Sequence, residues 1–168
     1  MNFSWWNAQV TGWPRFLVGR RPAVTGVRVA AVLLLYFGFF RVSFQPIRVA
    51  GVSMEPNYHD GQLRLLNARV YRSSEPQRGD VVAIRPQRNR TVVLKRIVAL
   101  PGERVSVRSG GRVYVNGELL EEPYVTGRGI PPQPEMLLGS DQYFAIGDNR
   151  SVTLYDVVRR DEILGRAK

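Results

Sequence analysis

The chain has 168 residues, 44% of them hydrophobic, with a formal net charge of +10 at pH 7, one histidine and no cysteine. The lack of cysteine excludes disulfide bonds, thiolate metal sites and a cysteine nucleophile. The positive charge indicates an anionic partner. Because the sequence carries no zinc-finger, helix-turn-helix or RNA-recognition signature, we expect an anionic lipid bilayer and no nucleic acid.

Residues 1–22 form a basic and aromatic segment, in which Arg15, Arg20 and Arg21 accompany three tryptophans. This composition is typical of the flank of a membrane span at the lipid–water interface. A basic flank ahead of a span predicts that the N-terminus is cytoplasmic and that the long C-terminal part is extracytoplasmic.

Residues 23–43 are predicted to form a single transmembrane anchor. The uncharged run from Val29 to Phe40 would rise only about 18 Å as a helix, against roughly 30 Å for a hydrocarbon core. Counting from Ala23, with Arg28 reaching toward the headgroups, gives about 27 Å. One alternative is a cleaved signal peptide, but the residues after the run offer a poor cleavage site. The other is a buried core helix, which would be less apolar all round.

Residues 44–168 are predicted to form an extracytoplasmic domain that is mainly β. Short apolar runs alternate with turn residues, Ser109-Gly110-Gly111 and Asn116-Gly117 are hairpin signals, and residues 126–134 are expected to be a loop. No segment with a helical period is present, so we expect coiled antiparallel sheets or a partly closed barrel. The predicted strands are Ile47–Val52, Leu63–Val70, Asp80–Ile84, Thr91–Leu100, Arg104–Arg108, Arg112–Val115 and Gln142–Ile146.

Lysine is nearly absent from this basic chain. Of 24 Lys and Arg residues, only Lys95 and Lys168 are lysines. A lysine can lose its proton when it is desolvated, whereas an arginine cannot, so Lys95 is a candidate base. A strand would place it on the same face as Val93 and Ile97. Its pKa would have to fall from about 10.4 to about 7–8, which burial can supply. The alternative is a lysine at a strand edge that reaches solvent.

A candidate nucleophile lies in Gly51-Val52-Ser53-Met54-Glu55-Pro56. A nucleophilic serine needs a sharp, exposed turn with a free backbone N–H, and Gly51 allows a close backbone approach. Taken alone, this segment is a weak signal, because a serine in a turn with glycine and proline is usually an ordinary turn residue. The single histidine, His59, follows six residues later and is expected to be a solvated turn residue without a catalytic role.

A second polar turn, Gly147-Asp148-Asn149-Arg150, ends a predicted strand and is followed by Ser151 and Thr153. Asp148 can pair with a cation, and a hydroxyl group nearby can orient an amine. The alternative is a capped loop.

Four segments in this order resemble the signature boxes of type I signal peptidases (leader peptidases), a family of serine peptidases with a Ser-Lys dyad. They are Ser53-Met54-x-Pro56, Gly79-Asp80-Val81-Val82, Lys95-Arg96-Ile97-Val98-x-x-Pro101-Gly102 and Gly147-Asp148-Asn149-Arg150. The resemblance extends from about Ile47 to Arg166. Four ordered boxes are far more specific than any one of them.

The resemblance implies that Ser53 is the nucleophile and Lys95 the general base. The backbone N–H of Ser53 would contribute to the oxyanion hole, and Gly51 implies that a second donor from a side chain is missing. Met54 would help to line the substrate cleft.

The resemblance also implies a supporting group of residues. Asp148 would pair with Arg96 beside the dyad, and the hydroxyl of Thr153 would orient the lysine, in place of the serine that is usual in the family.

Two departures from the family pattern are visible. Asn57 replaces the threonine that is common after the first box, which we expect to have a mild effect. After Thr153 the chain departs from the family's x-Asp-Ser-Arg. We expect a one-residue bulge that lets Asp156 pair with Arg159 or Arg160.

The resemblance therefore implies a single-pass enzyme of the cell (inner) membrane that removes signal peptides from translocated preproteins without a metal or cofactor. Its substrates would carry small residues at the first and third positions before the cut. One alternative is a specialised peptidase of the same superfamily that matures pilins or conjugation components. A self-cleaving Ser-Lys repressor is a further alternative, against which the anchor argues. The last is a catalytically inactive membrane-anchored homologue.

Overall fold

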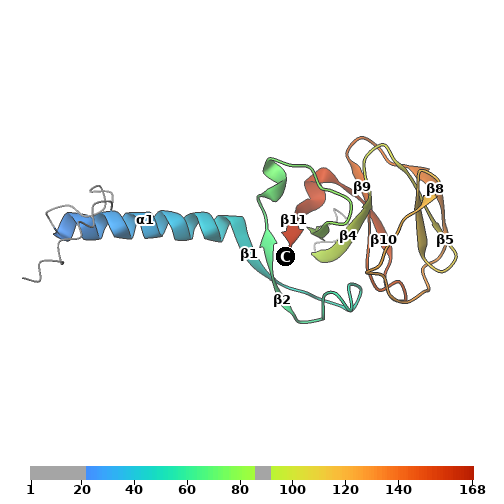
Figure 1. Cartoon of the computed structure of the whole chain (residues 1–168), viewed down its shortest axis with the longest axis horizontal. Coiled ribbons are helices and arrows are strands. Elements are labelled where there is room, and N and C mark those ends of the chain that lie inside the picture. Colours follow the sequence, from blue (N-terminus) through green and yellow to red (C-terminus); the bar gives the residue numbers. More distant parts are fainter. Residues whose placement is uncertain (1–21, 86–91) are drawn as a thin grey trace, which may run out of the picture. The chain divides into compact units, whose positions relative to one another are not determined.

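The structure is a computed structural model that describes residues 22–85 and 92–168 and comprises two compact units, Met1–Arg41 and Val42–Lys168. Figure 1 shows a long helix in the first unit and a β domain in the second. The predicted basic flank, up to residue 21, and the first residue of the predicted strand Thr91–Leu100 lie outside the described residues.

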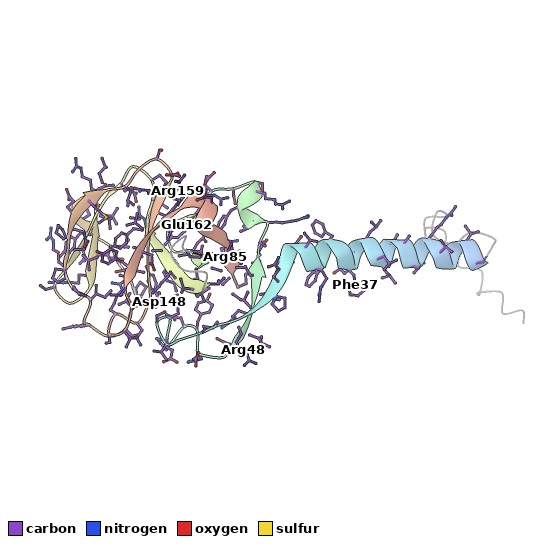
Figure 2. All side chains as sticks on the ribbon, turned by 180° about the vertical axis from the view of Figure 1, so that it is seen from behind. Phe37, Arg48, Arg85, Asp148, Arg159 and Glu162 are labelled. Atoms are coloured by element: carbon purple, nitrogen blue, oxygen red, sulfur yellow. The ribbon has the colours of Figure 1, made fainter. Side chains whose placement is uncertain are left out.

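Helix α1 comprises Pro22–Ser43. Its 22 residues rise about 33 Å, close to the thickness of a hydrocarbon core. Within Ala23–Ser43, an 18-residue window has a mean hydropathy of 1.9 and contains no buried residue. Figure 2 shows side chains, Phe37 among them, projecting on all sides of the helix. The helix thus has the length and composition of the anchor predicted over residues 23–43.

The larger sheet of the β domain has seven antiparallel strands in the order β1-β2-β11-β3-β4-β9-β10. It is open, with β1 and β10 at its edges, and Figure 1 shows β4, β9 and β10 side by side. The strands are β1 (Phe44–Arg48), β2 (Leu63–Asn67), β3 (Val81–Ile84), β4 (Val93–Ala99), β9 (Gln142–Ile146), β10 (Tyr155–Arg159) and β11 (Ile163–Ala167).

The smaller sheet has four antiparallel strands in the order β7-β6-β5-β8. The predicted antiparallel β architecture is therefore confirmed, but the described strands form two open sheets and no closed barrel, because each sheet keeps two edge strands. The strands are β5 (Arg104–Arg108), β6 (Arg112–Val115), β7 (Glu118–Leu119) and β8 (Gln133–Leu137), and two short 3₁₀ helices, η1 (Val70–Arg72) and η2 (Arg160–Glu162), complete the elements.

Strands β4 and β9 are buried on both faces. On β9, Phe144 and Ile146 belong to a core cluster shared with β5 and β6, whereas Tyr143 and Ala145 belong to a second cluster on the opposite face. Burial on both faces explains why these strands read as nearly continuous apolar runs. Lys95 lies in β4 and interrupts such a run.

The sequence predicted most of these strands. Strands β5, β6 and β9 have the predicted bounds, and β2, β3 and β4 lie within theirs. The first strand is shifted: β1 ends at Arg48, because the chain leaves the sheet there and forms the turn that carries Ser53. Strands β7, β10 and β11 were not predicted, and β8 begins inside the expected loop 126–134.

Candidate active site

Ser53 lies in a compact turn between β1 and β2. Within the turn, the Glu55 N–H donates to the Val52 carbonyl at 3.3 Å and the Tyr58 N–H to the Met54 carbonyl at 3.0 Å. Gly51 has a φ of +88°, which favours glycine, and its N–H donates to Asp60 Oδ1 at 2.8 Å. The Ser53 side chain is half-buried, and its N–H has no hydrogen-bond acceptor within the described residues.

Hydrogen bonds hold this turn against the segment after β9. The Asn149 N–H donates to the Ser53 carbonyl at 3.0 Å, and Asn149 Nδ2 donates to the Val52 carbonyl at 3.3 Å. From a neighbouring loop, Thr126 Oγ1 donates to the Glu55 carbonyl at 3.1 Å. The nucleophile turn, Val52–Asn57, is therefore positioned from outside as well as by its own bonds.

Lys95 projects from the middle of β4, where it is paired with Val82 of β3. The residue is only 7% exposed. Its Nζ donates to Thr153 Oγ1 at 2.7 Å and to the Leu154 carbonyl at 3.1 Å. Two donated bonds fix the direction of the amine and leave its third position for another partner.

Burial lowers the pKa of Lys95, because the charged form loses its hydration, and the negative charge of Asp156 acts in the opposite direction. The pairings Ile97↔Ala145 and Ala145↔Asp156 place Asp156 on the same face of the sheet as Ile97 and Lys95. Burial raises the pKa of Asp156, whereas the Lys95 charge lowers it and Glu162 raises it.

Gly147 brings the two candidate catalytic segments together. A Cβ at this position would overlap with the Ser53 carbonyl oxygen and with Thr153 Oγ1. The hydroxyl that binds Lys95 and the backbone of the serine therefore lie against the same Cα atom. Among the described residues, no hydrogen bond joins the side chains of Ser53 and Lys95.

The expected neighbours Arg96 and Asp148 form a bidentate ion pair. Arg96 Nε donates to Asp148 Oδ1 at 2.8 Å, and Nη2 donates to Oδ2 at 2.7 Å. Asp148 is 1% exposed, and Figure 2 shows it well away from Arg159 and Glu162. The guanidinium also lies 4.0 Å from the ring centroid of Tyr124 and donates to the Gly79 carbonyl at 2.9 Å.

Asn57 is a contact residue whose importance the sequence did not indicate. Its Nδ2 donates to Asp148 Oδ2 and to the Tyr124 carbonyl, each at 2.9 Å. The replacement of a threonine was visible in the sequence, but the two acceptors come from segments 67 and 91 residues away, which no local pattern reveals.

Two further residues that the sequence singled out are Met54 and His59. Met54 is 1% exposed and packs in a core cluster with Leu66 and Val81, so its contact with substrate stays a prediction. His59 is exposed.

The expected pair between Asp156 and Arg159 or Arg160 does not form among the described residues. Instead, Arg159 pairs with Asp141 at 3.1 Å and Arg160 with Glu75 at 3.3 Å. The chain continues directly into β10 after Thr153, and this places Asp156 on the Lys95 face of the sheet.

A mainly apolar cavity of about 270 Å³ lies beside the nucleophile turn and strand β4, which carries Lys95. Val49 and Ala50 line it just before the nucleophile turn, and Val93 and Leu94 line it just before Lys95. No group of three or more His, Asp or Glu side chains that could hold a metal occurs in residues 22–85 and 92–168.

Comparisons with known proteins identify the family to which the chain is similar. A family model described as signal peptidase, peptidase S26, matches residues 23–168. The chain is 32% identical to the Synechocystis sp. protein named Probable signal peptidase I-2 over 156 residues, which cover 84% of this chain and 69% of the relative. It is 29% identical to signal peptidase I T of Bacillus subtilis over 157 residues, covering 83% and 79%. A crystal structure of a signal peptidase I from Enterococcus faecalis V583 is 27% identical, covers 55% of this chain and 97% of that chain, and has a TM-score of 0.48.

Proposed function

The chain belongs to the signal peptidase family, peptidase S26, as a signal peptidase I that cleaves signal peptides, and we propose that Ser53 is its nucleophile and Lys95 its general base. The observation that supports this assignment best is the environment of Lys95. Its amine is buried and bound by Thr153 and Leu154, and burial lowers its pKa. A neutral amine is the form that a general base needs.

In the acylation step, neutral Lys95 accepts the proton of the Ser53 hydroxyl as the serine oxygen attacks the scissile carbonyl carbon. The oxyanion that develops accepts a hydrogen bond from the Ser53 N–H, which has no other acceptor in the described chain. The C–N bond then breaks, and the Lys95 ammonium gives its proton to the leaving amine. The products are an ester on Ser53 and a neutral Lys95.

In the deacylation step, Lys95 takes a proton from a water molecule, whose oxygen attacks the ester carbonyl. The ester C–O bond breaks, and Lys95 returns the proton to the Ser53 oxygen. Thr153 and the Leu154 carbonyl keep the amine in one orientation through both steps. The Asp148–Arg96 ion pair supports the segment that carries Thr153, because Asp148 lies at the start of that segment.

Substrate residues before the cut are proposed to occupy the 270 Å³ cavity. Its walls include the residues just before the nucleophile turn and just before Lys95, so a peptide bound there would lie next to both segments. The residues at the first and third positions before the cut, which we expect to be small, would then contact its apolar lining.

The remaining proposals concern the membrane. The helix α1 would anchor the chain with residues 1–21 in the cytoplasm and residues 44–168 outside, because the basic residues precede the helix. The net charge of +10 of the whole chain would favour anionic lipids at the membrane surface.

The test compares full-length wild type, Ser53→Ala and Lys95→Arg in detergent on a preprotein with an Ala-x-Ala site. We expect cleavage by wild type alone, since arginine keeps the charge but cannot release a proton. Cleavage by the Lys95→Arg protein would assign the base to another group. A wild type that cleaves no preprotein would favour the inactive homologue.

A further inference from the structure

The nucleophile turn is bound to the rest of the site mostly through its carbonyl groups. Asn149 and Thr126 donate to the carbonyls of Val52, Ser53 and Glu55. A backbone carbonyl can be contacted whatever the side chain is. Among the described residues, the Asn57 side chain contributes two hydrogen bonds that leave this turn, one to the Asp148 carboxylate of the supporting ion pair and one to the Tyr124 carbonyl.

We propose that Asn57 is a positioning residue that fixes the Ser53 turn on the Asp148–Arg96 ion pair. Both of its bonds run from the single amide nitrogen Nδ2, at 2.9 Å to Asp148 Oδ2 and 2.9 Å to the Tyr124 carbonyl. A primary amide has two hydrogens on that nitrogen and can satisfy both acceptors at once. The inference rests on the proposed role of Ser53 as nucleophile.

The two groups that accept hydrogen bonds from Asn57 explain why this residue matters to Ser53 and Lys95. Asp148 is nearly fully buried, and its carboxylate receives two bonds from Arg96 and one from Asn57. The Arg96 guanidinium in turn lies on the ring of Tyr124, the residue whose carbonyl accepts the second Asn57 bond. Asn57 thus joins the nucleophile turn to β4, which carries Lys95, through charged and well-fixed groups.

The chemistry of the amide distinguishes it from similar side chains. A threonine hydroxyl has one hydrogen and could keep only one of the two bonds. An aspartate has the same shape but no donor when ionised, so its oxygens would face the Asp148 carboxylate and the Tyr124 carbonyl. An alanine removes both bonds without adding repulsion.

Asn57 is exposed on its outer side, so its replacement leaves no cavity in the core. A change in rate can therefore be separated from a loss of folding. A matched control is Gln62→Ala, which removes a side chain from the same loop whose bond, from the His59 N–H to Gln62 Oε1 at 3.2 Å, does not reach the ion pair.

The experiment measures kcat, KM and melting temperature for the full-length wild type, Asn57→Ala, Asn57→Thr, Asn57→Asp and Gln62→Ala in detergent. We expect kcat to fall about tenfold in Asn57→Ala, because small displacements of reacting groups cost large factors in rate. The loss should be smaller in Asn57→Thr and larger in Asn57→Asp. The KM value should change little, and Gln62→Ala should stay within about twofold of wild type.

A kcat in Asn57→Ala equal to that of wild type would overturn the inference. So would losses that only follow the melting temperature across the variants, since these would show a purely structural role. Ser53→Ala is measured alongside: if it cleaves like wild type, the proposed nucleophile is wrong. If it is inactive while Asn57→Ala is fully active, only the role of Asn57 is wrong.

Discussion

At the scale of single residues, the hydroxyl of Thr153 has every hydrogen-bonding position in use. It accepts from Lys95 at 2.7 Å and from the Gly147 N–H at 3.1 Å, and it donates to the Leu154 carbonyl at 3.0 Å. One donor and two acceptors are all that a hydroxyl offers. The group therefore has one orientation, and so does the amine that it binds.

Replacing Thr153 with valine should lower kcat by about 10- to 100-fold, because the methyl group that replaces the hydroxyl cannot orient Lys95. Thr153→Ser keeps the hydroxyl and should retain most of the activity. Steady-state kinetics on a preprotein measure both variants. Full activity in Thr153→Val would show that Lys95 needs no orienting hydroxyl.

The charge of Asp156 should set part of the pH dependence. Burial lowers the pKa of Lys95, and the Asp156 carboxylate raises it. Asp156→Asn removes the opposing charge, so the Lys95 pKa should fall further and the neutral base should form at lower pH. The acidic limb of the kcat/KM–pH profile should then move to lower pH.

Asp161→Asn is the control for this shift. Asp161 is an exposed carboxylate 3.7 Å from Arg159 Nε, and its removal should leave the profile in place. A shift to higher pH in Asp156→Asn, or none, would contradict the assignment of Lys95 as the base.

At the scale of elements, the turn after β9 must pass unusually close to the nucleophile turn. Gly147→Ala should reduce both stability and activity, because its Cβ would overlap with the Ser53 carbonyl and Thr153 Oγ1. We expect a loss of about 1–3 kcal/mol in the free energy of unfolding. Gly139→Ala is a milder control, since its Cβ would meet the flexible Gln142 side chain. Thermal melting and kinetics that match wild type would contradict this close packing.

The elements that the sequence predicted are those with local signals. The hairpin between β5 and β6 follows from Ser109-Gly110-Gly111, and β9 follows from its continuous apolar run. Strand β8 contains Pro134 and lies at the edge of its sheet, where the missing N–H is tolerated. Because proline usually marks a loop, the sequence favoured a loop there.

Strand β11 was missed for a related reason. It lies between β2 and β3, but it contains Gly165, which reads as a break in a strand. The structure gives the reason for this glycine: a Cβ there would overlap with the Asn67 carbonyl.

The site was predictable where the family pattern applies and unpredictable where contacts are distant. The order of the boxes identified Arg96 and Asp148 as a candidate pair from the sequence alone. It did not reveal the bonds of Asn57 to Tyr124 and Asp148, which depend on how three loops meet. The expected partner of Asp156 was wrong because β10 continues the sheet, and a strand fixes side-chain direction by its two-residue period.

At the scale of the whole molecule, the absence of cysteine makes the proposed topology directly testable. Single cysteines can be introduced as Ser4→Cys in the N-terminal segment and as Ser109→Cys in the exposed turn between β5 and β6. In intact cells, a membrane-impermeant maleimide should label Ser109→Cys, and it should label Ser4→Cys only after permeabilisation. The opposite labelling would place the β domain in the cytoplasm.

The central claim is that Ser53 is acylated with the help of Lys95. The most direct measurement treats the full-length protein with a serine-directed acylating probe and locates the adduct by peptide mass spectrometry. We predict a single adduct on Ser53 that is absent in Ser53→Ala and forms far more slowly in Lys95→Arg. An adduct on another serine, or an unchanged rate in Lys95→Arg, would contradict the dyad.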